Sequence, residues 1–180
     1  VRNGVGKVSN ARVHDFSKKY DLAILELEKP FSKKFSIDEK DFVDPRVGEE
    51  VLIVGYPGAG ETFDFPTMTE GIISKEFHGN GEGVFLTSAI VNPGNSGGPV
   101  INLNNKLVGV VFAFSDLAGV LKDTGIIETA LGYGISSSKI NEIFKYNKSV
   151  PIKKASYNKS SIYEKMLPRV VFVAVLKDKE

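Results

Sequence analysis

The clearest chemistry in this sequence belongs to a serine flanked by glycines. Residues 91–99 read Val-Asn-Pro-Gly-Asn-Ser-Gly-Gly-Pro, with Ser96 near the centre. In a tight glycine-rich loop a serine can expose its Oγ while successive backbone N–H groups point into one small space, which is how an oxyanion hole is built. An ordinary glycine turn between two strands is the alternative. The length of the ordered motif between two apolar segments favours a nucleophilic serine.

Few other side chains could take part in catalysis or bind a cofactor. The sequence has no cysteine, which excludes thiolate catalysis and thiolate metal sites. Its only histidines are His14 and His78, which are far apart and match no metal-ligand spacing. We therefore expect no metal and no cofactor.

Composition narrows the class of partner. Lys and Arg number 23 and Asp and Glu number 22, so no net charge attracts nucleic acid or an anionic membrane. The hydrophobic content of 42% is enough for a packed core. No apolar run approaches the roughly 20 residues that span a bilayer. Nucleic acid and integral membrane insertion are therefore not expected.

Short strands must position Ser96. Residues 21–28 form an apolar run typical of a buried strand, and Asn104-Asn105 is typical of a tight turn. A helix is predicted over 137–145 with a serine cap from residues 136–138, and another from a capping box at Ser161, ended by Pro168. Many short strands at this spacing favour an antiparallel barrel. The predicted strands are 7–13, 21–28, 47–55, 69–77, 84–90, 100–103 and 107–114.

The motif around Ser96 and five further motifs, taken in their order along the chain, resemble the chymotrypsin-fold serine proteases. They are most similar to the HtrA/Deg branch. The lead-in Thr87-Ser-Ala-Ile-Val-Asn-Pro-Gly-Asn-Ser is the most specific part. The resemblance runs from about residue 7 to residue 145 and implies an all-β fold of two antiparallel barrels, the first of them incomplete here. The supporting motifs are Asp21-Leu-Ala-Ile-Leu, Ile53-Val-Gly-Tyr-Pro-Gly58, Gly71-Ile-Ile-Ser74, Leu107-Val-Gly-Val110 and Gly132-Tyr-Gly-Ile135.

The resemblance also implies roles for individual residues. Ser96 matches the nucleophile and Asp21 the carboxylate that orients the catalytic imidazole, although an aspartate there could also serve only a turn. The backbone N–H groups of Gly94 and Ser96 match the oxyanion hole. The family usually has aspartate where this chain has Ser88, which leaves the local hydrogen bonding of the loop open.

The general-base histidine has no match. The family carries it upstream of the aspartate, and no such segment precedes Asp21 here. His14, seven residues before Asp21, would have to fold back to serve, and His78 follows a predicted strand far from the motif. We expect that the chain lacks the histidine-bearing segment.

The implied substrate is an extended or unfolded polypeptide, laid along residues 107–114 by strand addition. The side chains that match the wall of the specificity pocket are Ile90, Phe112, Ala113 and Phe114. None is acidic, so a small or medium apolar residue is expected before the scissile bond. HtrA-like quality control, an extracytoplasmic location and a homo-oligomer follow from resemblance alone. The alternatives are a peptide-binding pseudoenzyme and a protease that processes one partner.

The resemblance divides the chain into five parts. Residues 161–180 resemble the first strand of the family, displaced to the end of the chain, and we predict that 170–175 pair with the residues near the N-terminus. Such an order would be that of a permuted chain, of a tandem array cut between copies, or of a sequence in which the histidine-bearing segment is missing or pieces are out of order. An unrelated amphipathic strand is the alternative. The parts are 1–30, a remnant of the N-terminal barrel; 31–46, a connection; 47–145, the C-terminal barrel; 146–160, a linker; and 161–180, the displaced strand.

Overall fold

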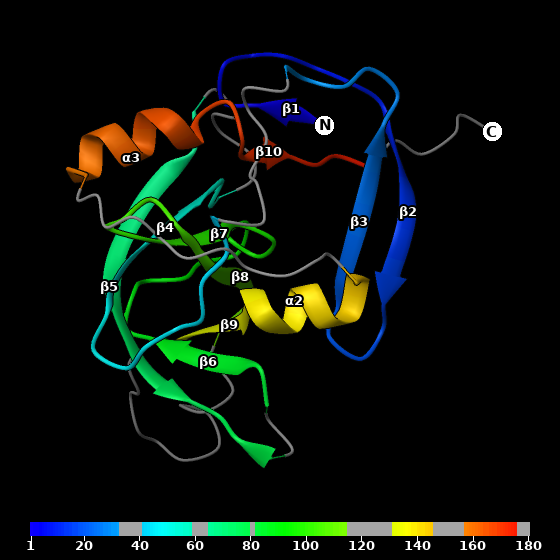
Figure 1. The fold of residues 1–180 in the computed structure, drawn as a ribbon. Helices are drawn as coiled ribbons and strands as arrows, with labels where there is room; N and C mark the ends of the chain where they lie inside the picture. The colour runs from blue at the N-terminus through cyan, green and yellow to red at the C-terminus, as the bar shows by residue number, and fades with distance from the viewer. Residues whose placement is uncertain (33–40, 59–64, 80–81, 115–130, 146–156, 176–180) are drawn as a thin grey trace, which may run out of the picture.

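The computed structural model describes residues 1–32, 41–58, 65–79, 82–114, 131–145 and 157–175, and the side chains of Ala113 and Phe114 lie outside the description (Figure 1). Most of the predicted linker at 146–160 and half of the predicted connection at 31–46 also lie outside it. The described part consists mainly of antiparallel strands. The predicted all-β class is therefore confirmed.

Six strands form a closed barrel, and residues 91–98, which are called the nucleophile loop after the role predicted for Ser96, connect two of them. Around the barrel their order is β4 (Glu50–Gly55), β5 (Thr67–Glu76), β6 (Val84–Thr87), β9 (Gly132–Ser136), β8 (Leu107–Phe114) and β7 (Pro99–Asn102), and each neighbouring pair is antiparallel. Five of these strands match predicted strands with ends that differ by at most a few residues, whereas β9 was not predicted as a strand, although the motif Gly132-Tyr-Gly-Ile135 lies within it. Alternate side chains point inward, and those of Val51, Ile53, Ile73, Phe85, Val100 and Val108 are almost fully buried.

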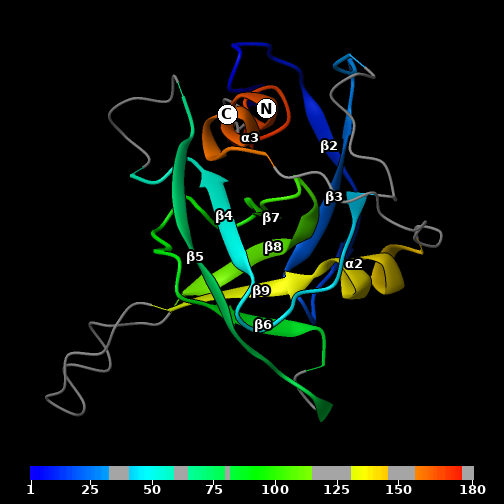
Figure 2. The ribbon, with the colours of Figure 1, turned by 60° about the vertical axis from the view of Figure 1, so that its left-hand side comes forward.

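The outer face of β4 is buried as well. Leu52, Val54 and Tyr56 alternate with the inward residues and form a second apolar cluster with Ile162 and Met166 of helix α3 (Lys159–Met166). Figure 2 shows α3 beside the upper end of β4. The helix begins two residues before the predicted capping box, because Asn158 is the cap and its Oδ1 accepts from Ser161 N–H at 2.7 Å.

The two ends of the described chain pair with each other. Strand β1 (Arg2–Asn3) is antiparallel to β10 (Val171–Phe172). Asn3 Nδ2 also donates to Pro168 O at 3.0 Å, and Gly4 N–H donates to Leu167 O at 2.8 Å. The predicted pairing of the tail with the N-terminal residues is confirmed, although it spans two residues rather than the expected six.

A separate two-stranded sheet stands beside the barrel. It consists of β2 (Ala11–Ser17) and β3 (Leu22–Leu27), with a bulge at His14 (Figure 1). The prediction of a buried strand at 21–28 is wrong, because no residue of β3 is buried. On β2, Val13 is 59% exposed and Phe16 is 58% exposed. The reason is that no layer of the described residues covers the apolar face of this ribbon.

Helix α2 (Ser137–Phe144) forms where the sequence predicted a helix, and it packs against β8 and β9. Its cap is Ser136, whose Oγ accepts from Lys139 N–H at 3.3 Å. Ser137 Oγ donates to Leu107 O at 2.6 Å, which fixes the start of the helix to β8. Neither described helix is both long and apolar enough to cross a membrane.

Candidate active site

Ser96 lies in a loop of two consecutive turns between β6 and β7. Asn95 N–H donates to Asn92 O at 2.9 Å, and Gly98 N–H donates to Asn95 O at 2.8 Å. Gly94 has φ +99° and Gly97 has φ +84°, which is backbone that favours glycine. The turns leave Ser96 exposed. The glycines flanking the serine are therefore required by the loop conformation itself.

The segment after β4 clamps this loop from one side. Tyr56 N–H donates to Gly94 O at 3.3 Å, and Gly58 N–H donates to Pro93 O at 3.2 Å. A Cβ at Gly94 would lie 2.1 Å from Tyr56 O, so only glycine fits there. The turn motif Gly55-Tyr-Pro-Gly58 is thus part of the site, a role that the sequence did not indicate.

Strand β8 holds the loop from the other side. Gly97 N–H donates to Val111 O at 2.7 Å, and Val111 N–H donates to Gly98 O at 3.0 Å. The loop is therefore fixed between two barrel strands. A loop held at both ends keeps its conformation when a substrate binds, which is the condition for preorganised electrostatic stabilisation.

The N–H groups of Gly94 and Ser96 are not used by the described part of this scaffold. The N–H groups of Asn95, Gly97 and Gly98 donate hydrogen bonds, whereas those of Gly94 and Ser96 donate to none of the residues that the structure describes. These are the two donors that the sequence assigned to an oxyanion hole. Asn95 between them turns its side chain inward, where it is 2% exposed.

Ser88 stands where the family usually has an aspartate, and its hydroxyl group accepts a hydrogen bond from β5. Ile72 N–H donates to Ser88 Oγ at 3.0 Å. The neighbouring Thr87 Oγ1 donates to Ile72 O and accepts from Ala89 N–H. The lead-in to the nucleophile loop is therefore attached to β5 without a carboxylate.

Asp21 lies outside the barrel, at the end of the turn that joins β2 to β3. Its φ is +50°, a conformation that aspartate tolerates better than most residues, so the turn alone can explain its presence. The tip of the hairpin lies against α2, where the Lys139 ammonium is 5.9 Å from the Tyr20 ring centroid. Within the described residues no hydrogen bond or ion pair joins Asp21 to the nucleophile loop.

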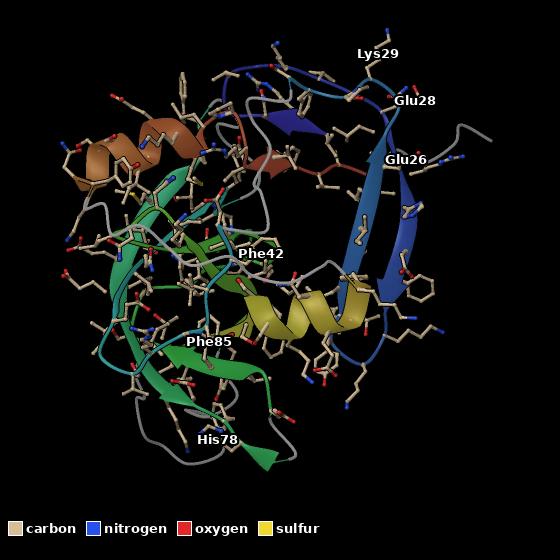
Figure 3. The ribbon with its side chains drawn as sticks, in the orientation of Figure 1. Glu26, Glu28, Lys29, Phe42, His78 and Phe85 are labelled. Atoms are coloured by element: carbon tan, nitrogen blue, oxygen red, sulfur yellow. The ribbon has the colours of Figure 1, made fainter. Side chains whose placement is uncertain are left out.

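Neither histidine lies in this loop. His14 is exposed at the bulge of β2, and its charge acts on Glu26. The Arg12 guanidinium, which donates a hydrogen bond to Glu26, holds the pKa of that carboxyl below its usual value, and His14 adds a smaller effect in the same direction. Figure 3 labels Glu26 on the hairpin and His78 at the opposite end of the molecule, beyond β5.

The predicted specificity residues are partly placed. Ile90 is 57% exposed, and its carbonyl accepts from Thr69 Oγ1 at 2.9 Å. The Phe112 ring is 6.3 Å from the Tyr133 ring, which in turn stacks on Phe77 at 6.3 Å. Tyr133 was not predicted as part of this aromatic group, although the motif Gly132-Tyr-Gly-Ile135 contained it. The side chains of Ala113 and Phe114 are outside the description.

The predicted substrate strand is shorter than expected. Along one edge of β8, β7 pairs with residues 107–110, and the nucleophile loop forms hydrogen bonds with Val111. Strand β9 pairs with the other edge as far as Phe114. The expectation that all of 107–114 receives substrate is therefore wrong. Only residues 112–114 keep an edge that no described strand covers.

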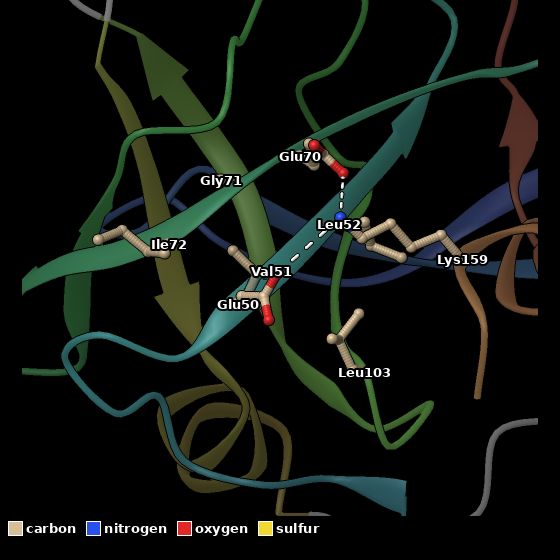
Figure 4. Close-up of a pocket in the computed structure, with 8 residues that line it drawn as sticks. All are labelled: Glu50, Val51, Leu52, Glu70, Gly71, Ile72, Leu103 and Lys159. Atoms are coloured by element: carbon tan, nitrogen blue, oxygen red, sulfur yellow. Dashed lines mark hydrogen bonds and ion pairs between the residues drawn. The ribbon is translucent and has the colours of Figure 1, made fainter. Parts of the chain in front are cut away.

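A small hollow elsewhere is unrelated to this loop. It lies between β4, β5 and α3, has a volume of about 140 Å³, and contains Lys159 between Glu50 and Glu70 (Figure 4). Within the described residues no three His, Cys, Asp or Glu side chains form a metal-binding group.

Comparison with known proteins finds similarity to serine proteases. Residues 1–110 match the model of the trypsin-like peptidase domain family. A probable periplasmic DegP-like serine endoprotease of Bartonella henselae is 38% identical over 120 residues, 63% of this chain and 22% of that protein. The Do-like serine protease HtrB of Bacillus subtilis is 34% identical over 132 residues, 68% of this chain and 26% of its own length.

A solved structure gives the same result. The serine endoprotease from Yersinia pestis superposes with a TM-score of 0.60 and 25% identity, over 78% of this chain and 44% of that one. The chain spans about a quarter of the length of the curated relatives quoted above.

Proposed function

Because the chain belongs to the trypsin-like peptidase domain family, we propose that it forms part of a serine endopeptidase in which Ser96 attacks the scissile carbonyl. The observation that carries the proposal is the nucleophile loop. It presents an exposed serine and two N–H groups, at Gly94 and Ser96, that no other described residue uses. A structural turn alone would not need these donors free.

The two N–H groups would bind the oxyanion of the tetrahedral intermediate. One such donor typically contributes about 2.7–4 kcal/mol to the transition state. Ser96 Oγ forms the bond to the carbonyl carbon and gives its proton to an imidazole, which then protonates the leaving amine. Water hydrolyses the resulting acyl-enzyme and restores Ser96.

Asp21 is proposed to orient that imidazole, but the imidazole itself would come from neither His14 nor His78. His14 lies beside Glu26 on the hairpin, and His78 lies beyond the end of β5. The catalytic imidazole would therefore belong to a histidine other than His14 and His78. This part of the proposal rests on the family motif and on the positions of both histidines.

The substrate is proposed to pair with residues 112–114 of β8. This edge is the only part of β8 that no described element covers, and it continues directly from Val111, to which the nucleophile loop is bonded. Ile90 and Phe112 would favour a small or medium apolar residue before the scissile bond. Extended or unfolded polypeptides fit such an edge because a folded chain has no free strand to offer.

Covalent labelling tests the nucleophile. A fluorophosphonate probe, supplied together with free imidazole as an external base, should modify Ser96, located by mass spectrometry of the digested protein. The rate should rise with imidazole concentration, and Ser96→Ala should remain unmodified. Labelling of another serine, or none at any imidazole concentration, would contradict the proposal.

A peptide-binding module without catalysis is the second candidate. It is favoured by one observation: His14 is exposed on the hairpin, His78 lies beyond the end of β5, and neither belongs to the nucleophile loop. Such a module would bind an extended apolar peptide at β8 and would fail the labelling test. Binding with labelling supports the endopeptidase, and binding without labelling supports the module.

A further inference from the structure

Tyr56 connects the nucleophile loop with the opposite end of the chain. Its backbone contacts the loop twice, since its N–H donates to Gly94 O and its carbonyl occupies the space beside Gly94. Its side chain points the other way, into the apolar cluster between β4 and α3, and is 7% exposed. A displacement of Tyr56 would therefore move the wall against which Gly94 packs.

The side chain is held by packing rather than by its hydroxyl group. The ring meets Phe172 of β10 edge to face, with centroids 5.9 Å apart and planes at 70°. The hydroxyl oxygen is buried and has no hydrogen-bond partner among the described residues. Burial raises the pKa of this phenol above its usual value. The position of Tyr56 thus depends on Phe172 and α3.

Phe172 is held by the pairing of β10 with β1 and by the turn that follows helix α3. β10 pairs with β1, and Val170 N–H continues the turn after α3 by donating to Met166 O at 2.9 Å. Met166 and Ile162 then pack on the same face of β4 as Tyr56. One continuous set of contacts therefore runs from the paired ends to the nucleophile loop.

We propose that Tyr56 is a positioning residue through which the paired ends β1 and β10 fix the oxyanion-binding loop. The inference rests on the proposed function for the meaning of that loop, but not for the mechanical link. Displacing β10 from β1 releases Phe172, lets the Tyr56 ring move, and loosens the hydrogen bonds that Gly94 and Pro93 accept. The β1–β10 pair thereby becomes a control point for the site.

Amide hydrogen exchange tests the link in the 180-residue chain. The reporters are the N–H groups of Tyr56 and Gly58, which donate to the loop, and the internal control is Ile73 N–H of β5, which donates to Glu49 O beside the start of the neighbouring strand β4. Phe172→Ala should speed exchange at both reporters at least 10-fold and leave Ile73 unchanged. The matched control Val173→Ala, at a residue 49% exposed, should change neither.

Further variants separate this role from general stability. Phe172→Leu keeps much of the volume and should still speed exchange at Tyr56 and Gly58, so it replaces Phe172→Ala if that protein fails to fold. Tyr56→Phe keeps the ring and should preserve wild-type protection. Unchanged reporters in a folded Phe172 variant, or equal acceleration at Ile73, would overturn the proposal.

The outcome is independent of catalysis. Exchange needs no reactive serine, so the same result is expected in the Ser96→Ala background. If Ser96 proves unreactive while Phe172 controls exchange, the proposed function is wrong and the link stands. If Ser96 reacts while exchange is indifferent to Phe172, the link is wrong and the function stands.

Discussion

Strands β3 and β4 have similar apolar sequences and opposite surroundings. β4 is Glu-Val-Leu-Ile-Val-Gly, and every residue from Val51 to Gly55 is buried. β3 is Leu-Ala-Ile-Leu-Glu-Leu, and none of its residues is buried. The difference comes from neighbours: β4 pairs with β5 and β7 and is covered on both faces, whereas β2 is the only described strand that pairs with β3. Sequence apolarity sets the capacity for burial, and tertiary contacts decide whether it is realised.

The comparison locates the stability of the molecule in the barrel. An isolated two-stranded hairpin is marginal in water, because it buries too little surface to offset the entropy of ordering its chain. Equivalent substitutions should therefore cost much more in the barrel than in the hairpin.

The largest difference in the free energy of unfolding is expected between alanine substitutions of two phenylalanines, one in the barrel and one in the hairpin. Phe85 is fully buried, with its ring in contact range of Gly109 and Gly134. Phe85→Ala should lower the free energy of unfolding by about 3–5 kcal/mol. Phe16→Ala, at a ring 58% exposed on the hairpin, should lower it by less than about 1 kcal/mol. Urea denaturation measures both, and equal losses would refute the comparison.

Two glycines with positive φ give the next difference. Gly94→Ala combines left-handed backbone strain with overlap on Tyr56 O and should cost about 2–4 kcal/mol. Gly6, in the turn before β2, has φ +79° but nothing within 4 Å of its Cβ position, so Gly6→Ala should cost only about 1–2 kcal/mol. Thermal or urea unfolding of the pair checks the order, and a reversed order would contradict the clamp at Gly94.

The sequence predicted the barrel better than it predicted burial or contacts between distant segments. Apolar runs and turn residues located five of the six barrel strands but not β9, and the glycines around Ser96 located the nucleophile loop. The exposure of β3 was missed because a local pattern does not reveal whether a facing layer exists. Asn158 was missed as a helix cap because the capping box at Ser161 was an equally good local signal. The clamp by Tyr56 depends on strand register, which no motif encodes.

Two asparagines test the same comparison in hydrogen bonding. Asn102 is 4% exposed; its Oδ1 accepts from Asn104 and Lys106 N–H, and its Nδ2 donates to Glu49. Asn102→Ala should cost about 1–3 kcal/mol because it leaves buried groups unpaired. Asn10 is exposed, and its side chain donates from Nδ2 to Glu28; its backbone carbonyl bonds are kept in alanine, so Asn10→Ala should be nearly neutral. A loss at Asn10 as large as that at Asn102 would argue that the hairpin is as tightly coupled as the barrel.

The smallest effect concerns pH. Arg12 lowers the pKa of Glu26, so this pair stabilises the hairpin above the unfolded pKa of the carboxyl group, and the stabilisation is lost as pH falls through the lower folded value. Arg12→Ala should raise the Glu26 pKa toward its usual value in an NMR titration. Because both groups are exposed, global stability should hardly change. An unchanged Glu26 pKa would show that the ion pair does not persist in solution.

The central claim is that the barrel carries the nucleophile and its oxyanion donors while neither the barrel nor the hairpin supplies the base. Loss of the base from a serine triad removes about 10⁶ in kcat, and orientation with an oxyanion hole leaves roughly 10³–10⁴ over water. The most direct measurement is turnover of casein and of an apolar-site peptide by these 180 residues alone. The account predicts no cleavage above background. Ordinary protease turnover that His14→Ala abolishes would contradict it and would place His14 beside Ser96.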